Sequence, residues 1–300
     1  MSWFYLALLA PLLYAIVNLL DDNLLRYVYK SPYFATVSAG LYGSLPLLSR
    51  LFIHAPNISP GLATLSVSAG FLTLAYYFFY FKGLESDTPS IVVALFGLAP
   101  ATIPFFAHFV VHERLPALAV AGFLVVLVAS LGLAVADLKQ LKFSKALLPV
   151  VVAVVFMDVV AIMTKYVYQQ ADFYPAYLYF SAGMGLSGVF FFFAKFTQNK
   201  QTFIEVKKVL KRLLPVFIAA ELTGLAAEFT LNLAISRGPV SLVKVIEGIQ
   251  PMFVLLIALA LYPFSPKYFR EAEEGKPVRK FILMAVVVSG LAIIAIATKA

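Results

Sequence analysis

The chain contains no cysteine, so disulfide bonds, thiolate metal ligands and cysteine nucleophiles are excluded. Charged residues are also scarce: they make up 13% of the 300 residues, against about 25% in soluble domains. Hydrophobic residues make up 62%, and the mean hydropathy is +0.92. This composition is typical of an integral membrane protein that passes through the bilayer several times.

Sequence signatures of enzymes and nucleotide-binding proteins are missing as well. The chain has no G-x-S-x-G motif, no phosphate-binding loop and no dinucleotide fingerprint. His108 and His112 have a spacing that suits a metal, but no third ligand accompanies them. The net charge of +8 comes without a basic, aromatic arm and is attributed to loops at the membrane surface. We therefore expect that the protein is not an enzyme and that it binds no cofactor, metal or nucleic acid.

Apolar runs of about 18–25 residues recur along the chain, as in helical membrane proteins, whereas barrel strands alternate over about 10 residues. The first run has no basic segment before it and no A-x-A site after it, so we expect a retained helix rather than a cleaved signal. The basic stretch 197–212 is expected to form an interfacial helix. The predicted fold class is an all-α membrane protein with ten transmembrane helices at 3–20, 33–53, 62–83, 88–111, 116–136, 146–169, 173–195, 211–236, 239–263 and 279–298.

The ten spans divide into two similar sets of five. Residues 26–40 contain R-Y-V-Y followed by S-A-G, and residues 165–183 contain K-Y-V-Y followed by S-A-G. An odd number of spans in each set reverses the direction in which the second set enters the membrane. We therefore predict two inverted-topology five-helix repeats, residues 1–138 and 139–300, without a separate soluble domain.

The repeats also share a helix-breaking pattern. Residues 89–100 align without gaps with residues 240–251. Proline removes a backbone donor from a helix, and glycine allows a neighbouring helix or ligand to approach closely. Both spans are therefore expected to be broken at equivalent places. The alignment pairs Gly97 with Gly248 and Pro100 with Pro251.

Two opposite charges lie inside the ninth apolar run, three residues apart. Lys244 and Glu247 share one helical face, so they can neutralise each other away from lipid. A discontinuous helix with charges near the middle of the bilayer is typical of a transport site. The alternative is an ion pair that only holds helices together.

Polar side chains also line the eighth and sixth spans. Glu221, Glu228 and Asn232 fall on one helical stripe, which cannot face lipid and must line a wet cavity or meet cations. Asp158 and Lys165 share a face of the sixth span and are expected to complete the charged lining. The alternative interpretation is a buried network that fixes helix register.

The first repeat supplies aromatic residues at the equivalent places. Tyr77 aligns with Glu228, and Tyr76 and Tyr80 lie on the same span, so one wall of the predicted cavity is aromatic and the other ionic. Such a cavity suits a zwitterionic or amphipathic organic molecule. Asp21 lies at the end of the first span, where a position at the membrane interface and a position in the site are equally expected.

Desolvation favours the neutral form of a carboxylic acid, so buried glutamates are candidates for coupling proton movement to transport. The candidates are Glu221, Glu228 and Glu247. Their pKa values cannot be ranked from the sequence, because it does not show which of them lies next to the lysine.

These features together resemble the EamA family of the drug/metabolite transporter superfamily. The resemblance is carried by the double repeat, the two G-x-x-P segments, the His-Glu-Arg-Leu sequence at 112–115, and Gly132 and Gly290 inside the fifth and tenth spans. It implies a secondary transporter of small metabolites or drugs, with a central cavity formed mainly by spans three, four, eight and nine and their neighbours. The charged V-K-V-I-E segment and the long hydrophilic connection after span nine depart from the common pattern and leave the substrate undefined.

The predicted function is secondary transport of a small organic metabolite or drug by alternating access across the cytoplasmic membrane of a prokaryote. An ion gradient, exchange or downhill flow must drive it, and protons are a candidate coupling ion. Expected partners are the solute and the bilayer, with a monomer or a homodimer as the assembly. Two alternatives stay open: a membrane-embedded enzyme that uses the carboxylates, and a lipid-carrier flippase of the same fold.

Basic residues are distributed unevenly between the two sides of this topology. One side receives Arg50, Arg114, Arg237 and Lys299, two lysines lie within spans, and the remaining Lys and Arg of the 23 fall on the other side. The positive-inside rule then places both termini outside. The resembled superfamily is commonly drawn with both termini inside.

Overall fold

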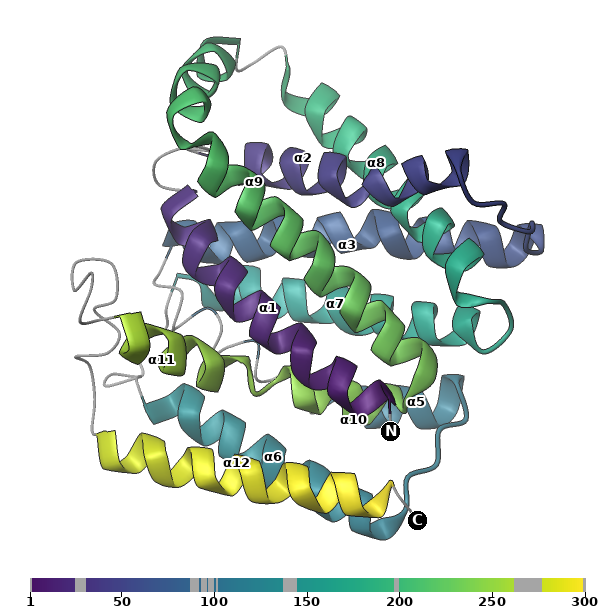
Figure 1. Ribbon diagram of the computed structural model, residues 1–300, viewed down its shortest axis with the longest axis vertical. Coiled ribbons are helices and arrows are strands. Elements are labelled where there is room, and N and C mark those ends of the chain that lie inside the picture. Colours follow the sequence, from purple (N-terminus) through teal and green to yellow (C-terminus); the bar gives the residue numbers. More distant parts are fainter. Residues whose placement is uncertain are drawn as a thin grey trace.

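The computed structural model describes residues 2–24, 31–86, 92, 96, 100, 102–136, 145–196, 200–261 and 277–298 (Figure 1). These residues form helices joined by turns, and no strand occurs among them. The helices are α1 (Ser2–Leu24), α2 (Pro32–Gly43), the 3-10 helix η2 (Leu45–Leu51), α3 (Pro60–Ser86), α5 (Ile103–Val110), α6 (Ala117–Ala136), α7 (Leu147–Tyr168), α8 (Phe173–Phe196), α9 (Lys200–Arg237), α10 (Val240–Glu247), α11 (Gln250–Leu261) and α12 (Pro277–Ala297).

Six apolar segments in the described part of the chain are long enough to cross a membrane. Two shorter apolar helices, Ala117–Ala129 and Ile282–Ala297, lie within α6 and α12. The six segments are Trp3–Asp21, Pro60–Ser86, Leu147–Tyr168, Phe173–Ala194, Leu214–Arg237 and Val240–Leu261, the last of which comprises α10 and α11.

The second expected span, residues 33–53, is divided in two. Helix α2 ends at Gly43, and η2 continues from Leu45, with Pro46 in its first turn. The α conformation is disfavoured for the residue before a proline, which explains the interruption. The fourth expected span, 88–111, lies mostly outside the described residues, and its last part forms α5.

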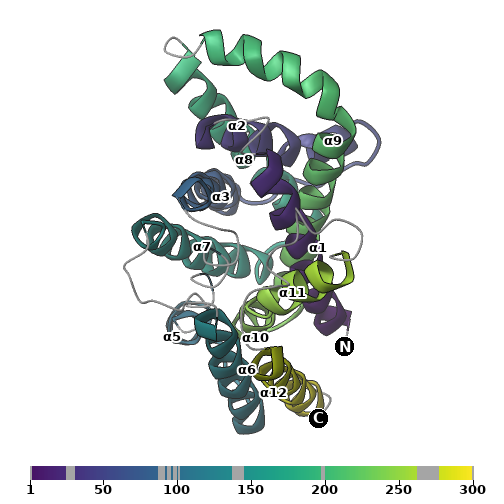
Figure 2. The ribbon, with the colours of Figure 1, turned by 90° about the vertical axis from the view of Figure 1, so that its left-hand side faces the viewer.

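The basic segment before the eighth span, which we expect to be an interfacial helix, is helical from Lys200. It forms the first part of α9, whose 38 residues run without a break into the span. Figure 2 shows that α9 bends, and the helix contains Pro215, a residue type that commonly causes kinks. The connection is continuous because no residue before Pro215 in α9 is a glycine or proline that would end the helix.

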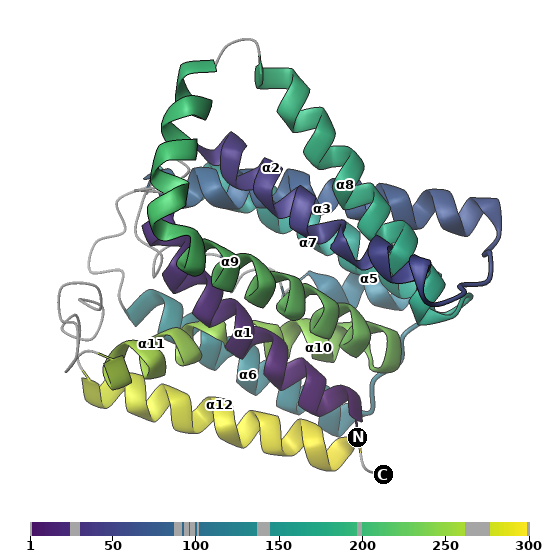
Figure 3. The same cartoon turned by 45° about the horizontal axis from the view of Figure 1, so that its top comes forward.

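Helices from the two expected repeats pack in alternation. Helix α1 runs along α9, α3 lies between α7 and α8, and α6 pairs with α12 (Figure 3). The approach of α3 to α8 requires glycine, because a Cβ atom at Gly70 would overlap the backbone of Phe180. This interleaving brings α1, α3, α7 and α9 around the junction between α10 and α11. The division at residue 138 remains a prediction.

Candidate functional site

The ninth expected span is broken beside its charges. Helix α10 ends at Glu247, α11 begins at Gln250, and the backbone N–H of Gly248 donates to the carbonyl of Lys244 at 3.1 Å. Gly248 also packs closely on the first half of the chain, since a Cβ atom there would lie 3.2 Å from Cγ of Pro100. The two G-x-x-P segments therefore meet at the break. Gly97 lies outside the described residues, and Pro251 lies in the first turn of α11.

Lys244 and Glu247 form the ion pair that their spacing predicts. The Nζ of Lys244 donates to the Oε2 of Glu247, and the side chains are 2% and 11% exposed. Every residue of α10 is buried. An isolated buried charge is costly, and the pair keeps each group from standing alone.

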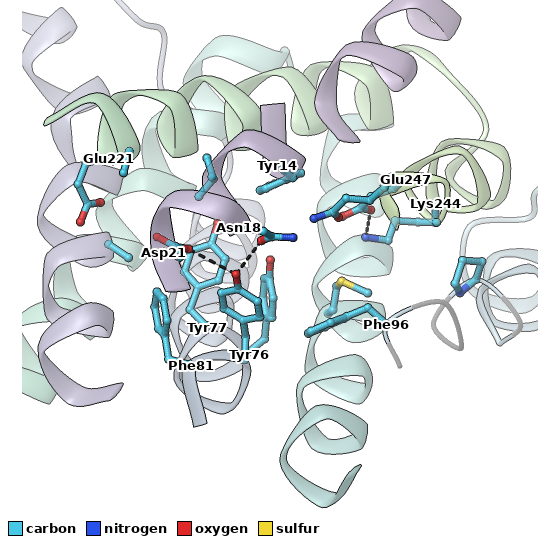
Figure 4. Close-up of a pocket in the computed structure, with 18 residues that line it drawn as sticks. Tyr14, Asn18, Asp21, Tyr76, Tyr77, Phe81, Phe96, Glu221, Lys244 and Glu247 are labelled. Carbon is cyan, nitrogen blue, oxygen red and sulfur yellow. Dashed lines mark hydrogen bonds and ion pairs between the residues drawn. The ribbon is translucent and has the colours of Figure 1, made fainter. Parts of the chain in front are cut away.

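A cavity of about 100 Å³ lies between α1, α3, α7, α9 and the α10–α11 break. This volume corresponds to about three water molecules at about 30 Å³ each. The ion pair forms part of the wall, and aromatic residues of α3 form another part (Figure 4). The lining residues are Tyr14, Val17, Asn18, Asp21, Ala39, Tyr76, Tyr77, Tyr80, Phe81, Phe96, Pro100, Met157, Ala220, Glu221, Lys244, Glu247, Gly248 and Gln250.

The polar groups of this cavity lie at two ends. Figure 4 shows Asp21 and Glu221 on one side and the Lys244–Glu247 pair on the other, with tyrosine rings between them. Glu221 accepts a hydrogen bond from Ser38 of α2. The predicted combination of an aromatic and an ionic wall is therefore present, with carboxylates at both ends.

Glu228 lies at the centre of a buried hydrogen-bond network that joins both halves of the chain. Its Oε2 accepts from the hydroxyls of Tyr14 at 2.8 Å and Tyr77 at 2.6 Å. Its Oε1 accepts from Nδ2 of Asn232 at 2.7 Å, and Tyr168 donates to Oδ1 of the same asparagine at 2.8 Å. The carboxylate is thus held by three neutral donors from α1, α3 and α9.

A second cavity of about 20 Å³ lies beside the first. The two share Tyr76, Met157, Lys244 and Glu247 in their walls. The second cavity adds Thr73, Val160, Ala161, Thr164, Glu228, Leu231, Asn232 and Ile235. The candidate residues of the eighth span therefore divide between the cavities, with Glu221 in the first and Glu228 and Asn232 in the second.

Polar contacts lie beside Ile235, a residue that lines the second cavity, and we call them the closing contacts. Lys165 donates to the carbonyls of Ile235 at 3.0 Å and Gly238 at 2.7 Å, at the C-terminal end of α9. The backbone N–H of Ser241 donates to Oε1 of Glu113 at 3.2 Å. A cation at the C-terminus of α9 and a carboxylate at the N-terminus of α10 both complement the helix dipoles.

Asp158 and Lys165 do not complete the lining of the cavities. Asp158 accepts from the hydroxyl of Thr102, the residue that precedes α5, and its Oδ1 is buried without a partner in the described part of the chain. Lys165 makes the closing contacts. The two residues share a face of α7 as predicted, but seven positions separate them by about 10 Å along the helix axis, so they meet different neighbours.

The sequence interpretation did not single out Tyr14 and Asn18, although a signal for them exists. With Asp21 they are spaced four and three residues apart, which places all three on one stripe of α1. Ser38, Thr102 and Tyr168 carry no such signal, because single hydroxyl residues are common in apolar helices. Their importance follows only from the carboxylates and the amide that they contact.

Comparisons with known proteins agree with this helical arrangement. Among solved structures, 29 chains match. One crystal structure of a protein superposes with a TM-score of 0.68 and 19% sequence identity, covering 97% of this chain and 96% of its own. At this identity the likeness shows the fold alone. No curated protein sequence matches.

The family comparison covers the first half. The model of the EamA-like transporter family matches residues 1–135. Together with the apolar helices, this match makes the chain an integral, multi-pass membrane protein. Over these residues the chain is similar to the EamA-like transporter family of the drug/metabolite transporter superfamily.

Proposed function

We propose that this protein is a secondary transporter that carries a small organic solute through the cavity by alternating access. The observation that carries the proposal is the position of the cavity at the α10–α11 break, where the buried pair of Lys244 and Glu247 forms part of its wall. Broken helices with charges next to a cavity are how many transporters bind their substrates. The sequence contains no nucleotide-binding motif, so the driving force is an ion gradient, exchange or downhill flow.

The walls of the cavity favour a solute with both charged and apolar parts. Lys244 presents an ammonium group beside Glu247, while Tyr76, Tyr77 and Phe96 present ring faces. The volume of about 100 Å³ is smaller than the about 300–1,000 Å³ of pockets that hold drug-sized ligands. These features support a small zwitterionic or amphipathic metabolite as the substrate.

Glu228 is our candidate for proton coupling. As an ionised acceptor it receives hydrogen bonds from Tyr14, Tyr77 and Asn232. Protonation turns one oxygen into a donor and removes the negative charge, so the hydrogen bonds that the carboxyl group accepts become weaker. Proton binding would then loosen α9 from α1 and α3, the helices of the other half. The hydrogen bonds to Glu228 are the first set of contacts that must break during transport. The closing contacts are the second set, and they must break before the second cavity opens.

Reconstitution tests this function directly. The purified protein in sealed liposomes should accumulate small zwitterionic metabolites down an imposed proton or exchange gradient, and leaky liposomes should not. Glu247→Gln should abolish accumulation. Asp158→Asn is the matched control, because Asp158 is a buried carboxylate that lines neither cavity.

The same preparation separates the alternatives. Conversion of a solute to a product in detergent, without a gradient, would identify an enzyme. Movement of a labelled lipid between leaflets, without solute uptake, would identify a flippase.

A further inference from the structure

One end of the cavity carries polar groups whose role the transport proposal leaves open. Asp21 and Asn18 on α1 are 8% and 5% exposed, and both line the cavity. The hydroxyl of Tyr80 on α3 donates to Oδ1 of Asn18 at 2.6 Å and lies 3.4 Å from Oδ2 of Asp21. These three residues form a compact acidic end, opposite the Lys244–Glu247 pair in Figure 4.

Among the described residues that line the cavity, no basic side chain belongs to this end. Lys244 is the one basic side chain among the described residues that line the cavity, and Glu247 already neutralises it. The contact that the structure gives the Asp21 carboxylate is the long one to the neutral hydroxyl of Tyr80. A positively charged group is therefore favoured here.

Asn18 provides a second, independent observation. Its Nδ2 is buried and has no hydrogen-bond partner among the residues that the structure describes. A buried donor without a partner is costly, and an acceptor on a bound molecule removes that cost. The neighbouring Oδ1 is already occupied by Tyr80. The amide is thus ready to donate to an oxygen of a ligand.

Ring faces surround the same end. Phe81 and Tyr77 line the cavity beside Asp21, and Tyr76 packs against Tyr77 with ring centroids 4.5 Å apart. Aromatic faces attract organic cations through the ring quadrupole. A carboxylate, a free amide donor and aromatic faces together recognise a protonated amine that has an oxygen acceptor nearby.

We propose that Asp21, Asn18 and Tyr80 form an amine subsite, which binds the ammonium group of a small organic amine and an adjacent hydroxyl or carbonyl oxygen. The proposal rests on the cavity being the solute site of the proposed transporter. The ammonium lies against Asp21, the oxygen accepts from Nδ2 of Asn18, and the apolar part of the solute faces the rings of α3. This subsite selects for positive charge at one end of the solute.

Three probes with the same branched carbon skeleton test the charge preference: isobutylamine, isobutyl alcohol and isobutyrate. Ligand-observed NMR titrations of the purified protein in detergent measure the affinity of each, with empty micelles as the blank. The amine should bind at least about tenfold more tightly than the alcohol. Equal affinities, tighter binding of isobutyrate, or no amine binding at about 10 mM would overturn the proposal.

Variants then assign the preference to Asp21. Asp21→Asn should weaken amine binding about tenfold and leave the alcohol within about twofold. Asp21→Glu should retain the preference, which guards against a folding defect, and Asp158→Asn is the control for loss of a buried carboxylate elsewhere. An unchanged preference in Asp21→Asn would contradict the assignment.

The acceptor side of the subsite needs a probe with an oxygen beside the amine. Valinol carries a hydroxyl next to the ammonium group, so it should bind more tightly than isobutylamine to the unmodified protein. Asn18→Leu should remove this advantage while the binding of isobutylamine persists. An advantage that survives in Asn18→Leu would show that the oxygen is bound elsewhere.

The experiments can disprove the amine subsite and the transport proposal independently of each other. If the amine binds through Asp21 but no solute accumulates in sealed liposomes, the amine subsite stands and the transport proposal falls. If solutes accumulate equally well with Asp21→Asn, transport stands and the subsite falls.

Discussion

The hydroxyl of Tyr77 donates a 2.6 Å hydrogen bond to the carboxylate of Glu228, and these residues occupy equivalent positions when the two halves of the sequence are aligned. Equivalent positions of a two-fold related pair of repeats meet each other only close to the axis. In the predicted inverted repeat, this bond would lie close to the two-fold axis. In the first half the position holds a donor, and in the second half it holds an acceptor.

The first prediction concerns the strength of this bond. A double-mutant cycle with Tyr77→Phe and Glu228→Gln should give a coupling free energy of about 0.6 kcal/mol and at most about 1.7 kcal/mol, as for other hydrogen bonds between membrane helices. Reversible unfolding in mixed micelles measures it. Phe79→Leu, on the same helix and without a hydroxyl, should show no coupling to Glu228→Gln.

The second prediction concerns proton coupling through Glu228. Glu228→Gln should abolish accumulation driven by a proton gradient in liposomes, because an amide does not exchange a proton in this range of pH. Exchange of labelled for unlabelled solute should continue, since that process needs no net proton movement. Proton-driven uptake at the unmodified rate in this variant would exclude Glu228 as the coupling residue.

The third prediction concerns the ion pair. Lys244→Met and Glu247→Gln should each stop transport while expression and monodispersity are largely kept. The exchanged pair, Lys244→Glu with Glu247→Lys, should fold better than either single reversal, because a lone buried charge costs about 3–5 kcal/mol. Size-exclusion profiles and proteoliposome uptake measure both effects. Normal uptake by both neutral variants would make the pair structural.

The fourth prediction concerns the closing contacts. Lys165→Met removes the bonds to the carbonyls of Ile235 and Gly238, so the far end of the second cavity should open more often. A single cysteine at Leu231, which lines that cavity, should then react faster with an impermeant thiol reagent. Lys82→Met provides the control, because Lys82 contacts the ring of Phe78 on α3 and makes no closing contact. Equal rates in all three proteins would show that these contacts do not close the cavity.

The fifth prediction concerns orientation, where the charge distribution places both termini outside. The chain has no native cysteine, so single cysteines at Ser2 and Asn199 can be labelled in intact cells with an impermeant maleimide. Cysteine at Ser2 should react and cysteine at Asn199 should be protected. The reverse pattern would place the termini inside.

Local features of the structure were accessible to sequence reasoning. Lys244 and Glu247 are three residues apart on one helix, so their contact depends on helix geometry and on little else. The break after Glu247 follows from Gly248 and Pro251, and α7 begins and ends within one residue of the expected span. Such features depend on neighbours in the chain.

The site itself depends on how the helices are rotated and how deeply they lie against one another. Lys165 donates a hydrogen bond to the backbone carbonyl of Ile235 in α9, and Asn18 accepts a hydrogen bond from Tyr80 of α3. Neither partner can be predicted from spacing along one helix. The carboxylates of the eighth span were identified, but their neighbours were not, because Tyr14 and Tyr77 come from helices far away in the sequence.

The sequence by itself determined that this chain is a helical membrane protein, where most of its helices begin and end, and which helix is broken beside an ion pair. Apolar length and local helix geometry are sufficient for that. Only the tertiary structure decided that Glu228 is held by neutral donors and that Asp21 faces a cavity, because burial and partners are set by packing between helices that the chain order leaves apart.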